Sequence, residues 1–222
     1  METFLVLKVS SLIFALKFKN MKETILQKAN EMFLSLGYKS VTMDDIASEM
    51  GISKKTIYQH FANKNELVEE SALHLFEHIS AGIDHIIAQE HNSIEEMFII
   101  RNFLMKNLKN ETASPFFQLQ KFFPKTFNCL RTKQFGKMHG SMIENLKKGV
   151  KDGLYRTDID VDFISRIYFT GLTGIKDTDI FPAETYEINS VTKQYMEYHL
   201  RSIVSENGLV KLIEVINKLT KY

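Results

Sequence analysis

The segment from Thr42 to Phe61 constrains the fold more than any other part of this chain. Apolar residues recur in it at helical spacing on both sides of Gly51. A glycine at this point allows the left-handed backbone of a tight turn, and the small Ala47 lets two helices cross closely. The segment therefore predicts a helix, a sharp turn and a second helix, with Ile57 and Phe61 facing inward.

Helical spacing of apolar residues continues along almost the whole chain, and no strand-like alternation is sustained. A first helix is predicted before Gly37, Thr42 is the expected cap of the next helix, and Asn63 opens a long helix to about Gln89. Further helices are predicted over 93–109, 115–123, 125–152, 160–176, 184–204 and 206–220. The chain is therefore predicted to be all-α.

The bulk composition carries no global charge or disulfide pattern that points to a particular function. The formal net charge is +1, so any affinity for nucleic acid must come from a local patch. Cys129 is the single cysteine, which rules out an intramolecular disulfide, and it is expected to act as a small buried hydrophobe. Three prolines and ten glycines are few for this length and favour long helices.

The polar residues of the second helix have the chemistry of a DNA-binding surface. Once the apolar seam is assigned inward, the residues left to point outward are Lys54, Lys55, Thr56, Tyr58, Gln59 and His60. Lysine neutralises phosphates, hydroxyls hydrogen-bond phosphate oxygens, and glutamine pairs with adenine edges. No acid lies between Ser53 and Lys64. A solvated basic face is the alternative, but it does not explain why this edge coincides with the Gly51 turn and the small Ala47.

This segment resembles the N-terminal domain of the TetR/AcrR family of regulators. The residues that carry the resemblance are Ser53-Lys54-Lys55-Thr56-Ile57-Tyr58-Gln59-His60-Phe61, followed by Asn63-Lys64 and Glu66-Leu67. The match spans about 22–68, and Lys55 stands where the family often has a small residue or proline. The resemblance implies that Thr42, Thr56, Tyr58 and Lys64 contact the DNA backbone. It also implies that Lys54, Lys55 and Gln59 lie nearest the bases, and that His60 contacts phosphate or lies at the edge of the motif.

The resemblance also implies a division of the chain. We expect a DNA-binding domain over 21–66, with the helix-turn-helix at 42–61, and a helical regulatory and dimerisation domain over 67–222. Residues 1–20 are expected to be an extension upstream of a natural start at Met21, or else a basic arm that packs on the first helix or reaches a DNA groove. Their apolar run is too short and interrupted to span a bilayer, so no stable membrane insertion and a cytoplasmic location are expected.

An effector pocket and a subunit interface are expected in the second domain. The candidate pocket residues for a small apolar effector are Phe98, Phe103, Phe117, Phe122 and Phe127, with plain core packing as the alternative for each. The candidate residues of a homodimer interface are Phe163, Ile167, Gly171, Met196, Leu200 and Ile203. A two-fold dimer would present two reading helices about 34–36 Å apart to a palindromic operator.

Catalysis, metals and cofactors are not expected. No nucleophile elbow, phosphate loop or metal quartet is present in the sequence. His74 and His78 are four residues apart, a spacing that can hold a metal, but a solvated polar helix face is the simpler interpretation. The leading hypothesis is a ligand-responsive repressor that binds double-stranded DNA. The alternative is a DNA-bound adaptor that works through a protein partner and senses no small molecule.

Overall fold

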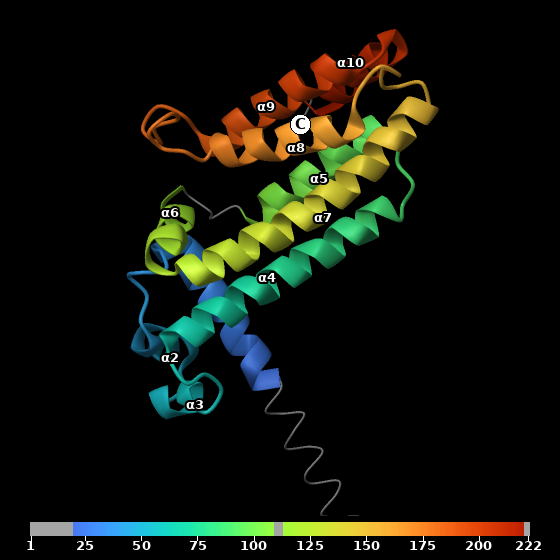
Figure 1. Cartoon of the computed structure of the whole chain (residues 1–222). Coiled ribbons are helices and arrows are strands. Elements are labelled where there is room, and N and C mark those ends of the chain that lie inside the picture. Colours follow the sequence, from blue (N-terminus) through green and yellow to red (C-terminus); the bar gives the residue numbers. More distant parts are fainter. Residues whose placement is uncertain (1–19, 109–112, 220–222) are drawn as a thin grey trace, which may run out of the picture. The chain divides into compact units, whose positions relative to one another are not determined.

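The computed structural model describes residues 20–108 and 113–219, and the expected extension over 1–20 falls almost entirely outside them. Within these residues the chain is helical, and no strand is formed apart from an isolated bridge between Tyr155 and Val204. A first helix over 20–36 is followed by α2 (Met43–Met50), α3 (Lys54–Tyr58), α4 (Lys64–Ile87), α5 (Ser93–Asn107), α6 (Ala113–Phe122), α7 (Pro124–Lys151), α8 (Val161–Gly174), α9 (Ile188–Ile203) and α10 (Glu206–Leu219) (Figure 1). The all-α prediction is confirmed.

The helices form two compact units. The first unit, called the head below, holds the described residues up to Phe76 together with Ser114–Phe127. The second unit, called the body, holds Glu77–Ala113 and the described residues from Asn128 onward. The head thus reaches beyond the expected 21–66 domain into α4, and it takes in α6, which the sequence assigns to the C-terminal part.

The head is built around a small apolar core. Phe33 from the first helix, Ile46 from α2, and Ile57 and Phe61 from the α3 region are each no more than 1% exposed. Burial of side chains of this size stabilises a fold by about 1.5–3 kcal/mol each. The first helix ends where predicted, at Gly37, which adopts φ +90°. This core holds the turn between α2 and α3 against the first helix.

Helix α6 packs on the loop that joins the first helix to α2. Gly37 has a left-handed backbone, which favours glycine, and a Cβ atom there would lie 2.5 Å from the Gln118 amide, so the Gln118 side chain would have to shift. The Gln118 Oε1 accepts a hydrogen bond from the Lys39 backbone N–H at 2.8 Å, and the Lys39 ammonium lies 4.8 Å from the Phe122 ring centre. This contact explains why α6 belongs to the head.

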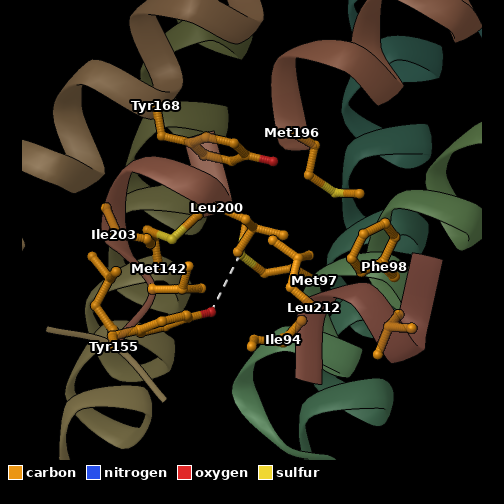
Figure 2. Close-up of a cluster of buried hydrophobic side chains, with 13 residues drawn as sticks. Ile94, Met97, Phe98, Met142, Tyr155, Tyr168, Met196, Leu200, Ile203 and Leu212 are labelled. Atoms are coloured by element: carbon orange, nitrogen blue, oxygen red, sulfur yellow. Dashed lines mark hydrogen bonds between the residues drawn. The ribbon is translucent and has the colours of Figure 1, made fainter. Parts of the chain in front are cut away.

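The body has its own core, drawn from α5, α7, α8, α9 and α10 (Figure 2). Met196, Leu200 and Ile203 of α9 and Leu212 of α10 are 0% exposed. In Figure 1, α8, α9 and α10 lie alongside one another. Tyr195 fixes α8 to α9, because its hydroxyl donates to the carbonyl oxygens of α8 residues 167 and 168 at 3.1 and 3.2 Å.

Most predicted helices are found with ends shifted by a few residues, but the helix predicted over 184–204 starts later, at Ile188. Pro182 begins a turn in which its carbonyl oxygen accepts hydrogen bonds from the N–H groups of Thr185 and Tyr186. Glu187 is the N-cap of α9 and accepts from the Ser190 N–H at 3.0 Å. Among the described helices, none is both long and apolar enough to cross a membrane.

Candidate nucleic-acid interface

Two N-terminal caps fix α2 and α3 in the head. Thr42 accepts a hydrogen bond from the Asp45 N–H, while the Asp45 carboxylate accepts from the Thr42 N–H at 2.8 Å, so a reciprocal capping box closes α2. The hydrogen bonds from Thr42 hold the pKa of Asp45 below its usual value. Ser53 caps α3 by accepting from the Thr56 N–H at 3.1 Å. The predicted cap at Thr42 is confirmed.

The turn between α2 and α3 has the predicted left-handed backbone. Gly51 adopts φ +64°, and its N–H bonds to carbonyl oxygens at the end of α2. Ala47 is 4% exposed in the seam between the helices. Ile57 is fully buried on the inner side of α3, which leaves Lys54, Lys55, Tyr58 and Gln59 exposed on its outer side.

We call these four residues the reading face. They lie at positions i, i+1, i+4 and i+5 of one short helix, so they project from the same side. All four carry donors for phosphate oxygens or base edges, and Tyr58 and Gln59 also carry an acceptor. No ion pair of Lys55 is present in the described part of the chain. The reading face therefore offers positive charge and hydrogen-bonding groups to a partner.

Lys54 is not free on this face, because Asp44 on α2 pairs with it. The Lys54 ammonium lies 2.7 Å from a carboxylate oxygen of Asp44 and 5.9 Å from the Tyr58 ring centre. The hydrogen bond to Asp44 raises the pKa of Lys54 above its usual value. Asp44 lies in the first turn of α2, where an acid is also favoured by the helix dipole. Its position ten residues before Lys54 could not show that the turn brings the two together.

The remaining predicted DNA contacts are partly engaged within the head. The Thr42 hydroxyl donates to Asp45, and the Thr56 hydroxyl lies 2.9 Å from that of Ser53. The Lys64 ammonium donates to the carbonyl oxygen of Lys39 at 3.0 Å, and burial lowers its pKa. His60 is half-buried beside Phe61, and burial lowers its pKa. The Lys64 ammonium has two further N–H donors, so a phosphate contact is compatible with its hydrogen bond to the Lys39 carbonyl.

The five phenylalanines predicted to line a pocket are divided between the head and the body. Phe117 and Phe122 are 53% and 40% exposed on α6 of the head, and the Lys121 ammonium lies over both rings. Phe127 also belongs to the head and is buried, whereas Phe98 and Phe103 belong to the body. The Phe103 ring fills the space where a Cβ atom of Gly82 would lie. The pocket prediction is therefore corrected for Phe117 and Phe122, which are surface residues.

The predicted dimer residues also divide. Met196, Leu200 and Ile203 are fully buried in the core of a single chain, so they are not available to a partner subunit, and the prediction for them is corrected. Gly171 serves close packing within the chain, since a Cβ atom there would lie 2.1 Å from the Tyr195 hydroxyl. Phe163 and Ile167, by contrast, are 59% and 45% exposed on α8.

The same face of α8 continues past these two residues. Arg166, Thr170 and Gly174 are exposed at helical spacing from Phe163, and Tyr198 on α9 is 72% exposed.

Among the described residues, no group of three or more histidine, cysteine, aspartate or glutamate side chains could hold a metal ion.

Known regulators share this head. Residues 25–71 match the family model described as bacterial regulatory proteins, tetR family. A stretch of 60 residues is 35% identical to the biofilm operon icaADBC HTH-type negative transcriptional regulator IcaR of Staphylococcus aureus, covering 27% of this chain and 32% of the relative.

Longer similarities extend into the body. The chain is 26% identical over 196 residues to the HTH-type transcriptional repressor KstR2 of Mycolicibacterium smegmatis, covering 84% of this chain and 92% of the relative. A solved TetR-family transcriptional regulator from Agrobacterium tumefaciens superposes with a TM-score of 0.68 at 17% identity, covering 85% of this chain and all of that one. The order and packing of helices are therefore those of this group of regulators.

Proposed function

Because this chain belongs to the TetR/AcrR family of transcriptional regulators, we propose that it is a repressor that binds a palindromic operator as a homodimer and releases it when a small molecule binds the body. The observation that carries the proposal is the reading face of α3. Its four side chains are exposed, and the polar groups of Lys55 and Gln59 have no described partner in the head. Polar groups of this kind on the second helix of a helix-turn-helix fit the major groove.

The reading face divides into two kinds of contact. Lys54, Lys55 and the Tyr58 hydroxyl suit phosphate oxygens, which supply affinity without sequence information. Gln59, and the lysines where they reach guanine edges, suit base readout. Thr42 and Thr56 lie at helix N-termini, where backbone N–H groups and the helix dipole favour a phosphate. We propose that Lys64 mainly positions the head through Lys39, and that His60 lies at the edge of the contact.

Dimerisation is proposed through the exposed face of α8. Phe163 and Ile167 are large apolar side chains exposed on one helix, and Thr170 and Gly174 on the same face allow a second helix to approach closely. No Cβ atom at Gly174 would meet another described atom within 4 Å, so this end of α8 is open. Tyr198 of α9 adds an exposed aromatic ring. Surfaces of this composition are typical of subunit interfaces.

A DNA-binding assay tests the proposal. Labelled duplexes from the region upstream of the chain's own gene are titrated with the protein, and fluorescence anisotropy is read against a scrambled duplex. Lys55→Ala is expected to weaken binding about tenfold, because a lysine at the groove contributes about 1–3 kcal/mol. Lys133→Ala removes the same charge from an exposed site on α7 of the body and is expected to change little. Equal effects of the two variants would contradict the assignment of the reading face.

The alternative, an adaptor that acts through a protein partner, predicts a different outcome. In that case operator binding depends on the reading face as above, but no small molecule changes it. A screen in which DNA release is read from anisotropy, with the protein already on its operator, separates the two functions.

A further inference from the structure

A group of polar side chains lies within the body. Arg101 comes from α5, Tyr168 from α8 and His199 from α9, so three helices far apart in the sequence supply it. The rings of Tyr168 and His199 lie 4.5 Å apart, and His199 is 4% exposed. Burial raises the pKa of the Tyr168 hydroxyl, and the nearby positive charge of Arg101 opposes that rise.

Two buried nitrogen atoms of this group lack a partner. The Nε of Arg101 and the Nε2 of His199 are both buried, and neither has a hydrogen-bond partner in the described chain. The Tyr168 hydroxyl makes no hydrogen bond to any described residue either. Buried donors without acceptors are costly and uncommon in native structures. Two such nitrogen atoms beside the Tyr168 hydroxyl therefore suggest that an acceptor from outside the chain completes them.

Another buried polar cluster of the same body shows what a completed network looks like. The Asn145 side chain donates to Glu96 at 2.7 Å and accepts from the Tyr155 hydroxyl at 3.1 Å. Lys148 lies 3.7 Å from the buried Glu96 carboxylate and balances its charge. In that network Asn145, Glu96 and Tyr155 have partners within the chain, whereas the Nε of Arg101 and the Nε2 of His199 have none.

The missing acceptor is expected to be an anion. No carboxylate of the described residues lies within ion-pair distance of the Arg101 guanidinium, which donates to the Asn189 carbonyl oxygen at 2.9 Å and to the neighbouring Asn102. The Glu187 carboxylate is nearby, but it accepts from the Ser190 N–H as the cap of α9. A partly buried guanidinium with no carboxylate in ion-pair contact favours a carboxylate ligand, which can accept two of its hydrogen bonds.

Apolar side chains surround the polar group. Phe98 is 4% and Met196 is 0% exposed, and Figure 2 shows the Tyr168 hydroxyl pointing toward the side of the core on which Met196 lies. Methionine side chains are unbranched and adapt to different ligand shapes. A ligand whose anionic end reaches Arg101 would therefore meet apolar surface with the rest of its length.

We propose that Arg101, Tyr168 and His199 bind the carboxylate of a small effector with an apolar body. This inference rests on the proposed function only in that the ligand regulates DNA binding, since binding of the ligand itself can be measured without DNA. It replaces the expectation of a purely apolar effector, and it assigns the anchor of the ligand to a residue of α5.

Carboxylates and tail-matched alcohols test the proposal. The full-length protein is titrated by calorimetry with butanoate, hexanoate, octanoate, decanoate and adamantane carboxylate, and with the alcohol of the same body in each case. At least one acid is expected to bind about tenfold more tightly than its alcohol, the ratio expected of one charge-assisted pair. If every alcohol binds as tightly as its acid, or if no acid binds, the proposal is overturned.

Variants locate the binding. Arg101→Gln is expected to remove the preference for the acid, whereas Arg131→Gln, an exposed arginine on α7, is expected to keep it. Tyr168→Phe removes only a hydroxyl, so it serves as the second variant if Arg101→Gln does not fold. It is expected to weaken the affinity for the acid several-fold and to leave the affinity for the alcohol unchanged. Retention of the acid preference by both variants would show that Arg101 merely fastens α5 to Asn189. If the protein binds its operator but binds none of the acids, this inference is contradicted and the proposed function is not affected.

Discussion

The reading face of the head and the polar clusters of the body differ in their exposure to solvent. In the head, the polar residues of α3 stand on the surface, over the apolar side chains of Ile46, Ile57 and Phe61. In the body, Glu96, Asn145 and His199 are each at least nine-tenths buried. Exposed groups are available to a large partner such as DNA, while buried groups must be satisfied within the chain or by a molecule small enough to enter it.

This difference sets the size of effect that substitutions should have. A change at a buried polar group alters the free energy of unfolding, because desolvation and packing are both affected. A change on the exposed face of α3 alters binding and leaves stability nearly unchanged. Variants of the body should therefore be detected in unfolding experiments, and variants of the head in DNA titrations.

The largest expected effect concerns the acid sensitivity of the body. Burial lowers the pKa of His199 to about 4, and the neighbouring Tyr168 and Tyr195 are uncharged in the acid range, as tyrosines ordinarily are. The unfolded chain binds the proton at a higher pH, near about 6.5, so the stabilisation is complete above that pH and is lost as the pH falls toward 4. Between neutral pH and pH 4 the loss is about 3 kcal/mol.

Urea unfolding at a series of pH values measures this loss. His199→Leu is expected to flatten the dependence of the unfolding free energy over that window, and His78→Gln, at an exposed histidine of α4, is expected to leave it unchanged. An unchanged slope in His199→Leu would mean that His199 is protonated in the folded body.

A smaller loss is expected where α8 meets α9. Gly171→Ala places a methyl group 2.1 Å from the Tyr195 ring and hydroxyl, so the tyrosine must leave its two hydrogen bonds to α8. The free energy of unfolding is expected to fall by about 1–3 kcal/mol, the range for overpacking. Gly140→Ala lies in open space on α7, away from the proposed interface, and is expected to leave the free energy of unfolding unchanged or to raise it by up to about 1 kcal/mol. Chemical denaturation compares the two, and similar results would refute the packing argument.

Within the head, the contact of α6 with the loop before α2 is expected to be weaker still. Gln118→Ala removes the acceptor of the Lys39 N–H, a hydrogen bond with a net worth of about 1 kcal/mol. Hydrogen exchange of the Lys39 amide is expected to become several-fold faster. Gln120→Ala, at an exposed neighbour on α6, should leave that amide unchanged. Slow exchange in both variants would show that α6 does not hold this loop.

The smallest expected effect is a gain of function on the reading face. Asp44→Asn releases Lys54 from its ion pair and removes a negative charge from beside the expected path of the DNA backbone. The affinity for DNA is expected to rise about two- to fivefold. The slope of log affinity against log salt concentration is expected to steepen by up to about 1, the value for one additional phosphate contact. Glu49→Gln makes the same charge change at another exposed position of α2 and serves as the control. An equal rise in both variants would assign the gain to net charge alone.

The sequence predicted the head more closely than the body for a physical reason. The turn at Gly51, the small Ala47 and the cap at Thr42 are local features that act over a few residues, so their spacing alone specifies the geometry. The ion pair of Asp44 with Lys54 was missed because it depends on how the turn orients two exposed side chains.

The body depends on contacts between distant segments, which spacing does not reveal. Arg101 and His199 are separated by most of the body in sequence, and no motif marks either residue. Periodicity correctly indicated that Met196, Leu200 and Ile203 share an apolar face, but it could not tell whether that face meets the chain's own core or a partner subunit. Phe117 and Phe122 were misassigned for the converse reason, since an aromatic residue on the surface looks the same in sequence as one in a core.

The most direct test of the reading face is selection of bound duplexes from a random pool, followed by sequencing, for the unaltered protein and for Gln59→Ala. The unaltered protein is expected to enrich an inverted repeat with half-sites about one helical turn apart. Gln59→Ala should enrich the same spacing with altered bases at one position of each half-site. The same motif with the same preference in both proteins, or no enriched motif at all, would contradict the claim that α3 reads DNA.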